Sequence, residues 1–109
     1  MADLQEHKAI VAKYATKLNT AALDGMARTY ALVLSNKDSQ YVACGDDEEK
    51  ATVCANFLKK KLALTNSDAD LNAAIEAVCV TMKEDRFKSR LAMYYLLADK
   101  FGKLAMFIK

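Results

Sequence analysis

Apolar side chains recur at spacings of three and four residues along most of the chain, which is the pattern of helices that bury one face. Five stretches carry this pattern: residues 3–18, 20–34, 46–62, 67–82 and 85–101. The pattern therefore predicts an all-α fold, a compact single-domain bundle of about five helices in which no β-strand is required.

The fifth stretch differs from the others because its apolar residues cover most of the helix circumference. They are Leu91, Met93, Tyr94, Leu96, Leu97, Ala98 and Phe101. A helix that is apolar all round is surrounded by other helices. We therefore expect the last long helix to be central.

Polar residues that favour helix ends stand between these stretches. Asn19 is the expected N-cap of the second helix, and Ser67 or Asp68 that of the fourth. The acidic residues 46–49 and the lysines 59–61 lie at the two ends of the third stretch, where the helix dipole favours each sign. We expect Asp70 and Glu76 of the fourth stretch to face outward, and the inner face of the third stretch to carry Ala51, Cys54, Phe57, Leu58 and Leu62.

The C-terminal tail is short and apolar. Gly102 is placed where a residue in the left-handed conformation would end the last helix. We expect Phe107 and Ile108 to pack against the bundle or across a self-association contact, because an apolar pair left in water would form an exposed patch.

Composition agrees with one soluble domain over residues 1–109. Apolar residues make up 53% and charged residues 28%, which is enough apolar material for a single core. The sequence has 3 glycines and 0 prolines, which favours helices. The net charge of +2 is far from the concentrated positive field of a dedicated nucleic-acid-binding domain, so nucleic acid is not the expected partner.

The N-terminus lacks the apolar core of a signal peptide, and the longest apolar run, residues 91–98, is too short to span a membrane. We expect a cytoplasmic protein without membrane contact. Cys44, Cys54 and Cys79 form no C-x-x-C pair, so we expect all three to be reduced, with Cys54 and Cys79 as small core residues.

Several segments together resemble a small bacterial family of uncharacterised helical proteins, the domain of unknown function 2853. The segments are residues 36–39, 56–62, 85–90 and 94–104. The most specific part is the Asp-Arg-x-Lys-Ser-Arg stretch followed by Tyr-Tyr-Leu-Leu-Ala. The resemblance implies a small helical fold in a bacterial cytoplasm and brings no activity with it.

Arg86 and Arg90 stand one helical turn apart in the fifth stretch, where their guanidinium groups would converge on an anion beside free helix amides. Alternatively, Arg90 lies on the apolar side of the helix and pairs with an internal carboxylate. The available carboxylates are Asp38, Asp85 and the acidic run 46–49. We favour the internal ion pair.

A basic patch is the second candidate site. Its members are Lys60, Lys61, Arg86, Lys88, Ser89 and Arg90. They form one surface only if the third and fifth helices lie side by side. A helix-turn-helix built from the third and fourth helices would present Asp68 and Asp70 to the major groove, which is the wrong sign.

Candidates for catalysis are weak. His7 lies in the apolar stripe of the first helix without a second ligand at helical spacing, so we expect a partly buried, hydrogen-bonded histidine. Cys44 precedes four consecutive carboxylates, which oppose thiolate formation. Since no nucleophile–base pair, glycine-rich phosphate loop or metal cluster is recognisable, we expect no catalytic residue, metal or cofactor.

These observations favour a non-enzymatic domain that acts through contact with another protein or with itself. A weak binder of nucleic acid or of a phosphate ligand through the basic patch is the alternative, and an enzyme of unrecognised type is the third possibility.

Overall fold

A computed structural model describes residues 4–15, 18–34, 41–84 and 88–108 of the chain. Its elements are α1 (Leu4–Tyr14), α2 (Thr20–Thr29), α3 (Ala31–Leu34), β1 (Tyr41–Val42), α4 (Asp47–Thr52), the π-helix η1 (Val53–Lys61), α5 (Asp68–Thr81), β2 (Lys88–Ser89), α6 (Arg90–Lys100) and the 3-10 helix η2 (Leu104–Phe107). The predicted helical class is confirmed. Within these residues, no helix has both the length and the apolar character needed to cross a membrane.

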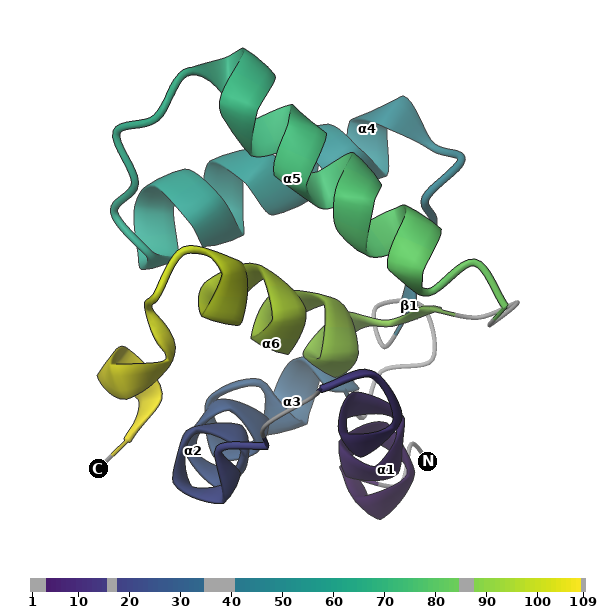
Figure 1. The fold of residues 1–109 in the computed structure, drawn as a ribbon, viewed down its shortest axis with the longest axis vertical. Helices are drawn as coiled ribbons and strands as arrows, with labels where there is room; N and C mark the ends of the chain where they lie inside the picture. Colours follow the sequence, from purple (N-terminus) through teal and green to yellow (C-terminus); the bar gives the residue numbers. More distant parts are fainter. Residues whose placement is uncertain (1–3, 16–17, 35–40, 85–87, 109) are drawn as a thin grey trace.

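Helix α6 lies between two groups of helices, with α4 and α5 on one side and α1, α2 and α3 on the other (Figure 1). It packs against α1, α2 and α5. Six of its residues have no exposed surface: Leu91, Ala92, Met93, Tyr95, Leu97 and Ala98. The prediction that the last long helix is central is confirmed.

The predicted apolar stripe of α5 is buried along its whole length. Its members are Leu71, Ala74, Ile75, Val78, Cys79 and Met82. Asp70 and Glu76 are exposed, as expected. Ser67 is the N-cap, and its side chain accepts a 3.2 Å hydrogen bond from the backbone N–H of Asp70. Asn19 caps α2 in the same way, with a 3.1 Å bond from the N–H of Ala22.

Two helices are shorter than their apolar patterns predict. The first ends at Tyr14, and Leu18 beyond it is 39% exposed. The second is interrupted at Tyr30, which leaves the helical conformation and packs its ring edge-on against Tyr94, with centroids 5.0 Å apart. Leu32, in the short helix α3 that follows, is 85% exposed.

A small antiparallel sheet joins two segments that the sequence did not mark as strands. Tyr41 pairs with Ser89 and Val42 with Lys88. The expectations of a strand-free fold and of a last helix from residue 85 were wrong, because residues 88–89 pair with β1 and α6 begins at Arg90. Ser89 caps α6, since its Oγ accepts a 3.3 Å hydrogen bond from the N–H of Ala92.

The third predicted helix consists of α4 followed by η1. Asp46 caps α4 by accepting hydrogen bonds of 2.9 and 3.4 Å from the N–H groups of Glu48 and Glu49. The buried residues of the second half are Val53, Cys54, Phe57, Leu58 and Leu62. Spacings of four and five residues suit a π-helix, whose hydrogen bonds reach five residues back. Ala51, predicted to face inward, is exposed instead.

The C-terminal segment folds back onto α2. Gly102 has a φ of +67°, which confirms it as a left-handed helix terminator. Phe107 is 2% exposed, so this half of the tail prediction is confirmed, whereas Ile108 is 44% exposed. Gly25 allows the close approach, because a Cβ atom there would lie 1.7 Å from the carbonyl oxygen of Phe107.

Candidate functional site

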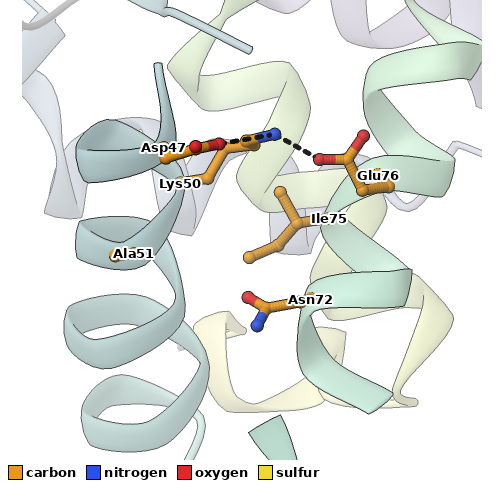
Figure 2. A pocket seen from close by; sticks show the side chains of 6 residues that line it. All are labelled: Asp47, Lys50, Ala51, Asn72, Ile75 and Glu76. Atoms are coloured by element: carbon orange, nitrogen blue, oxygen red, sulfur yellow. Dashed lines mark hydrogen bonds and ion pairs between the residues drawn. The ribbon is translucent and has the colours of Figure 1, made fainter. Parts of the chain in front are cut away.

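A groove of about 300 Å³ opens between α4 and α5 (Figure 2). Its lining residues are Asp47, Lys50 and Ala51 from α4 and Asn72, Ile75 and Glu76 from α5. Small-molecule sites usually occupy about 300–1,000 Å³. The groove is therefore suited to a side chain or a short segment of a partner rather than to a large cofactor.

Lys50 lies at one end of the groove between two carboxylates (Figure 2). Its Nζ is 3.5 Å from Oδ1 of Asp47 and donates a hydrogen bond to Oε1 of Glu76. The bond to Glu76 raises the pKa of Lys50 above its usual value and outweighs the opposing effect of desolvation. The side chains of Asp47 and Glu76 are 99% and 55% exposed, so both carboxylates remain accessible to a second cation.

The rest of the groove is less polar. Ile75 points into it from α5, and Ala51 faces it from α4, with the amide of Asn72 beyond them (Figure 2). Asp46 and Glu48 are exposed at the N-terminal end of α4. Since Lys50 is the one cation that lines the groove and is already paired, this face of the described molecule has an excess of negative charge.

A disulfide joins the two walls at one end of the groove. Cys44, two residues before the N-cap of α4, is bonded to Cys79 of α5, with Cα atoms 6.0 Å apart. The expectation that all three cysteines are reduced is therefore wrong, although Cys54 is free and buried as predicted. Burial raises the pKa of the Cys54 thiol.

Arg90 closes an internal ion pair, as the favoured interpretation predicted. It is 8% exposed, and its Nη2 donates to Oε1 of Glu49, a residue of the acidic run. Nη2 also donates to the carbonyl oxygen of Tyr41 at 3.4 Å, and Nη1 donates to the hydroxyl of Tyr94 at 2.9 Å. Burial works against the charge, yet the contacts with Tyr94 and Glu49 raise the pKa of Arg90 above its usual value.

The described members of the predicted basic patch lie apart. Glu49, the partner of Arg90, stands near the start of the continuous helix 47–61, whereas Lys60 and Lys61 stand at its end. The Nζ of Lys61 lies 5.7 Å from the ring centroid of Phe107, beyond the C-terminus of α6. Lys88 and Ser89 are in β2, at the opposite end of α6. Arg86 lies outside the described residues, as do Asp38 and Asp85.

His7 is 2% exposed, and its Nδ1 lies 2.6 Å from the Oγ of Ser89, which is fully buried. The prediction of a buried, hydrogen-bonded histidine is confirmed. The pair contains the groups of a nucleophile and a base, but the same Ser89 oxygen caps α6, and neither residue lines the α4–α5 groove. The hydrogen bond between His7 and Ser89 fixes α1 against the start of α6.

A second, smaller groove of about 240 Å³ lies between α5 and α6. It is lined by Ala77, Val78, Thr81, Leu96, Asp99 and Lys100. Val80 nearby on α5 is 62% exposed. The two charged residues of this groove have opposite signs, so it lacks the charge excess of the α4–α5 groove.

The motif segments agree with a comparison of the sequence with known families. The family described as a protein of unknown function (DUF2853) matches residues 5–105. The chain belongs to the DUF2853 family. The match covers most of the sequence and confirms the resemblance carried by the four motif segments. No curated protein matches the chain.

In this DUF2853 chain, sequence reasoning found the separate parts of the candidate site but not their assembly. Residues 46–49 were recognised as a helix start, and Glu76 as an outward-facing residue of the fourth helix. Asn72 and Lys50 were missed, because a polar residue on an exposed helix face gives no sign of which helix lies opposite. The available signal for the site was that Asp47 and Glu76 each stand beside an apolar stripe, one in the third predicted helix and one in the fourth.

Proposed function

We propose that this domain is a protein-interaction module that binds a basic segment of a partner protein in the α4–α5 groove. The single observation that carries the proposal is the placement of Asp47 and Glu76 at the edge of a groove that is lined by exposed Ala51 and by Ile75, which is 1% exposed. In this proposal the domain is not an enzyme, and it works in a bacterial cytoplasm.

The chemistry of arginine and lysine fits such a groove. Their aliphatic stems pack on apolar surface while their charged heads stay at its edge. A stem laid along exposed Ala51 would bring its cation to Glu76, where it competes with Lys50 for the carboxylate. An arginine has the further advantage of a bidentate pair with a carboxylate.

The charge distribution favours a protein partner over nucleic acid. The groove has an excess of carboxylates, which phosphate groups avoid. The lysines at the end of η1 are separated from the start of α6, and Lys59 is paired with Asp68. Arg90 is buried in its own ion pair and is not available for a phosphate.

Titration with synthetic peptides tests the proposal. A short peptide of alternating arginine and leucine is compared with one of alternating glutamate and leucine and with duplex DNA. We expect saturable binding of the arginine peptide that weakens with salt, because exposed charges are screened. Equal binding of both peptides, or no binding of the arginine peptide, would overturn the proposal. Light scattering during the titration identifies binding of a second copy of the chain.

A further inference from the structure

We infer that the Cys44–Cys79 disulfide is a site of thiol–disulfide exchange that controls the shape of the α4–α5 groove. The inference rests on the proposed function, because the groove is taken as the binding site. It concerns what holds the α4 wall in place.

The disulfide connects α5 to the segment that leads into the α4 wall. Cys44 lies two residues before Asp46, the N-cap of α4, and Cys79 lies on α5 one turn beyond Glu76 and Ile75. The bond therefore sets the distance between the N-terminal end of α4 and the C-terminal part of α5. Lys50 and Glu76 bridge the same walls further along the groove.

Little else holds α4 against α5. None of the residues of α4 is buried, so this wall has no apolar anchor of its own before Val53. The bridge from Lys50 to Glu76 is exposed, and exposed ion pairs contribute little to stability. The ion pair of Glu49 with buried Arg90 holds the middle of α4 to α6. The loosely held part of the wall is therefore the segment before Glu49, because a segment with few buried apolar contacts opens at low free-energy cost.

The two sulfur atoms belong to residues of different accessibility. Cys79 is 7% exposed, whereas Cys44 is half-buried in the loop between β1 and α4. Exchange requires access of a thiolate to a disulfide sulfur. Cys44 is therefore the residue through which a reductant acts.

A dithiol reductant supplies a balanced reaction. Its first thiolate attacks Sγ of Cys44, forms a mixed disulfide and expels Sγ of Cys79 as a thiolate, which takes up a proton. Its second thiolate then attacks the reductant sulfur of the mixed disulfide and releases Cys44, which is also protonated. Two electrons pass to the protein, and the dithiol becomes a disulfide. In cytosolic proteins of mesophiles such disulfides are usually transient.

The oxidised state is the binding-competent one. Holding α4 and α5 in a fixed relation prepares the groove, and preorganisation reduces the ordering cost of binding. Reduction frees the N-terminal end of α4, which carries Asp47, to move away from α5 and so disorders one edge of the groove, while the ion pair of Glu49 with Arg90 still holds the rest of α4. Reduction is therefore expected to weaken binding of a basic segment.

The test uses the full chain carrying Cys54→Ala, which removes the third thiol and keeps the disulfide. Hydrogen exchange of the amides in residues 46–52 and the affinity for the arginine–leucine peptide are measured before and after reduction with dithiothreitol. We expect faster exchange in residues 46–52, unchanged exchange in α6, and an affinity at least about fivefold weaker, as in typical coupling between sites. The double variant Cys44→Ser, Cys79→Ser should reproduce the reduced state without a reductant.

The outcomes separate the two proposals. Unchanged exchange and affinity on reduction, or a disulfide that dithiothreitol does not reduce in the folded protein, would overturn the redox inference. Faster exchange in α4 together with an absence of peptide binding in both states would overturn the proposed function and support redox control of the α4 wall.

Discussion

Nη1 of Arg90 donates a hydrogen bond to the hydroxyl of Tyr94, 2.9 Å away and one turn further along α6. The other side of the guanidinium group reaches Glu49. Through these contacts one buried cation joins the first turn of α6 to α4, so Arg90 stabilises the fold rather than presenting a surface charge.

Replacing Arg90 tests this structural role. Arg90→Ala is expected to lower the free energy of unfolding by about 3 kcal/mol, the low end for a broken buried pair, because part of Glu49 remains exposed. Arg90→Met should cost less than Arg90→Ala, since methionine retains much of the stem packing. Chemical denaturation of both variants measures the difference.

The matched control is Arg28→Met, because Arg28 is an exposed residue of α2. We expect it to change stability by no more than about 0.5 kcal/mol. If phosphate at constant ionic strength stabilised the wild type but not the Arg90 variants, Arg90 would be an anion site and the structural role would be refuted.

Gly25 is expected to be intolerant of any side chain. In Gly25→Ala the new Cβ would lie 1.7 Å from the carbonyl oxygen of Phe107, which is a backbone atom. The C-terminal segment must move, at a cost of about 1–3 kcal/mol or more. Gly45→Ala is the control, because a Cβ atom there meets nothing within 4 Å.

Deleting residues 104–109 should also destabilise the fold, since it removes buried Phe107. In that shortened chain Gly25→Ala should add almost no further cost, because the clashing carbonyl is gone. Additive losses of stability in the combined variant would contradict the packing of the tail on α2.

The cysteines differ in their expected reactivity. Denatured, unreduced protein should show one thiol, Cys54, whereas reduced protein should show all 3. In the folded protein Cys54 should react slowly, because burial raises the pKa of its thiol. The double variant Cys44→Ser, Cys79→Ser should lose about 2–4 kcal/mol of stability, typical for a disulfide. Three reactive thiols in the unreduced, denatured chain would exclude the bond.

Tyr30 predicts a loss of stability at alkaline pH. Burial, together with repulsion by Tyr94, raises the pKa of Tyr30 above its usual 10.0. As the pH rises, the unfolded chain therefore loses the Tyr30 proton before the folded chain does. The contribution of neutral Tyr30 to the free energy of unfolding is complete below about pH 10 and decreases as the pH rises further. Urea unfolding of wild type and Tyr30→Phe at several pH values should show a shallower alkaline loss in the variant. Parallel curves would remove Tyr30 as the cause.

The spacing of apolar residues predicted the helical parts of this fold, because the residues that a helix buries are set by their positions within that helix. The stripe of α5 and the central place of α6 follow from the spacing of apolar residues alone. The same spacing did not predict the interruption at Tyr30, since its ring contact with Tyr94 depends on another helix. Nor did it separate α-helical from π-helical backbone in residues 53–61.

For contacts between distant segments, the sequence could predict the kind of partner but not which residue it is. An internal carboxylate was expected for Arg90, but tertiary packing selected Glu49 from several candidates. The partner of His7 lies 82 residues away, and Cys44 and Cys79 are separated by 35. The groove depends on how α4 faces α5, which no single segment encodes.

The contribution of Glu76 to peptide binding tests the central claim most directly. The affinity for the arginine–leucine peptide is measured for wild type, Glu76→Gln and Asp70→Asn. Asp70→Asn is the matched control, because Asp70 is an exposed carboxylate of α5 outside the groove and its loss changes the net charge by the same amount. We expect Glu76→Gln to weaken binding about fivefold, as for the loss of one favourable exposed pair, and Asp70→Asn to have less than about a twofold effect. Equal effects of the two substitutions, or full affinity in Glu76→Gln, would show that the α4–α5 groove is not the binding site.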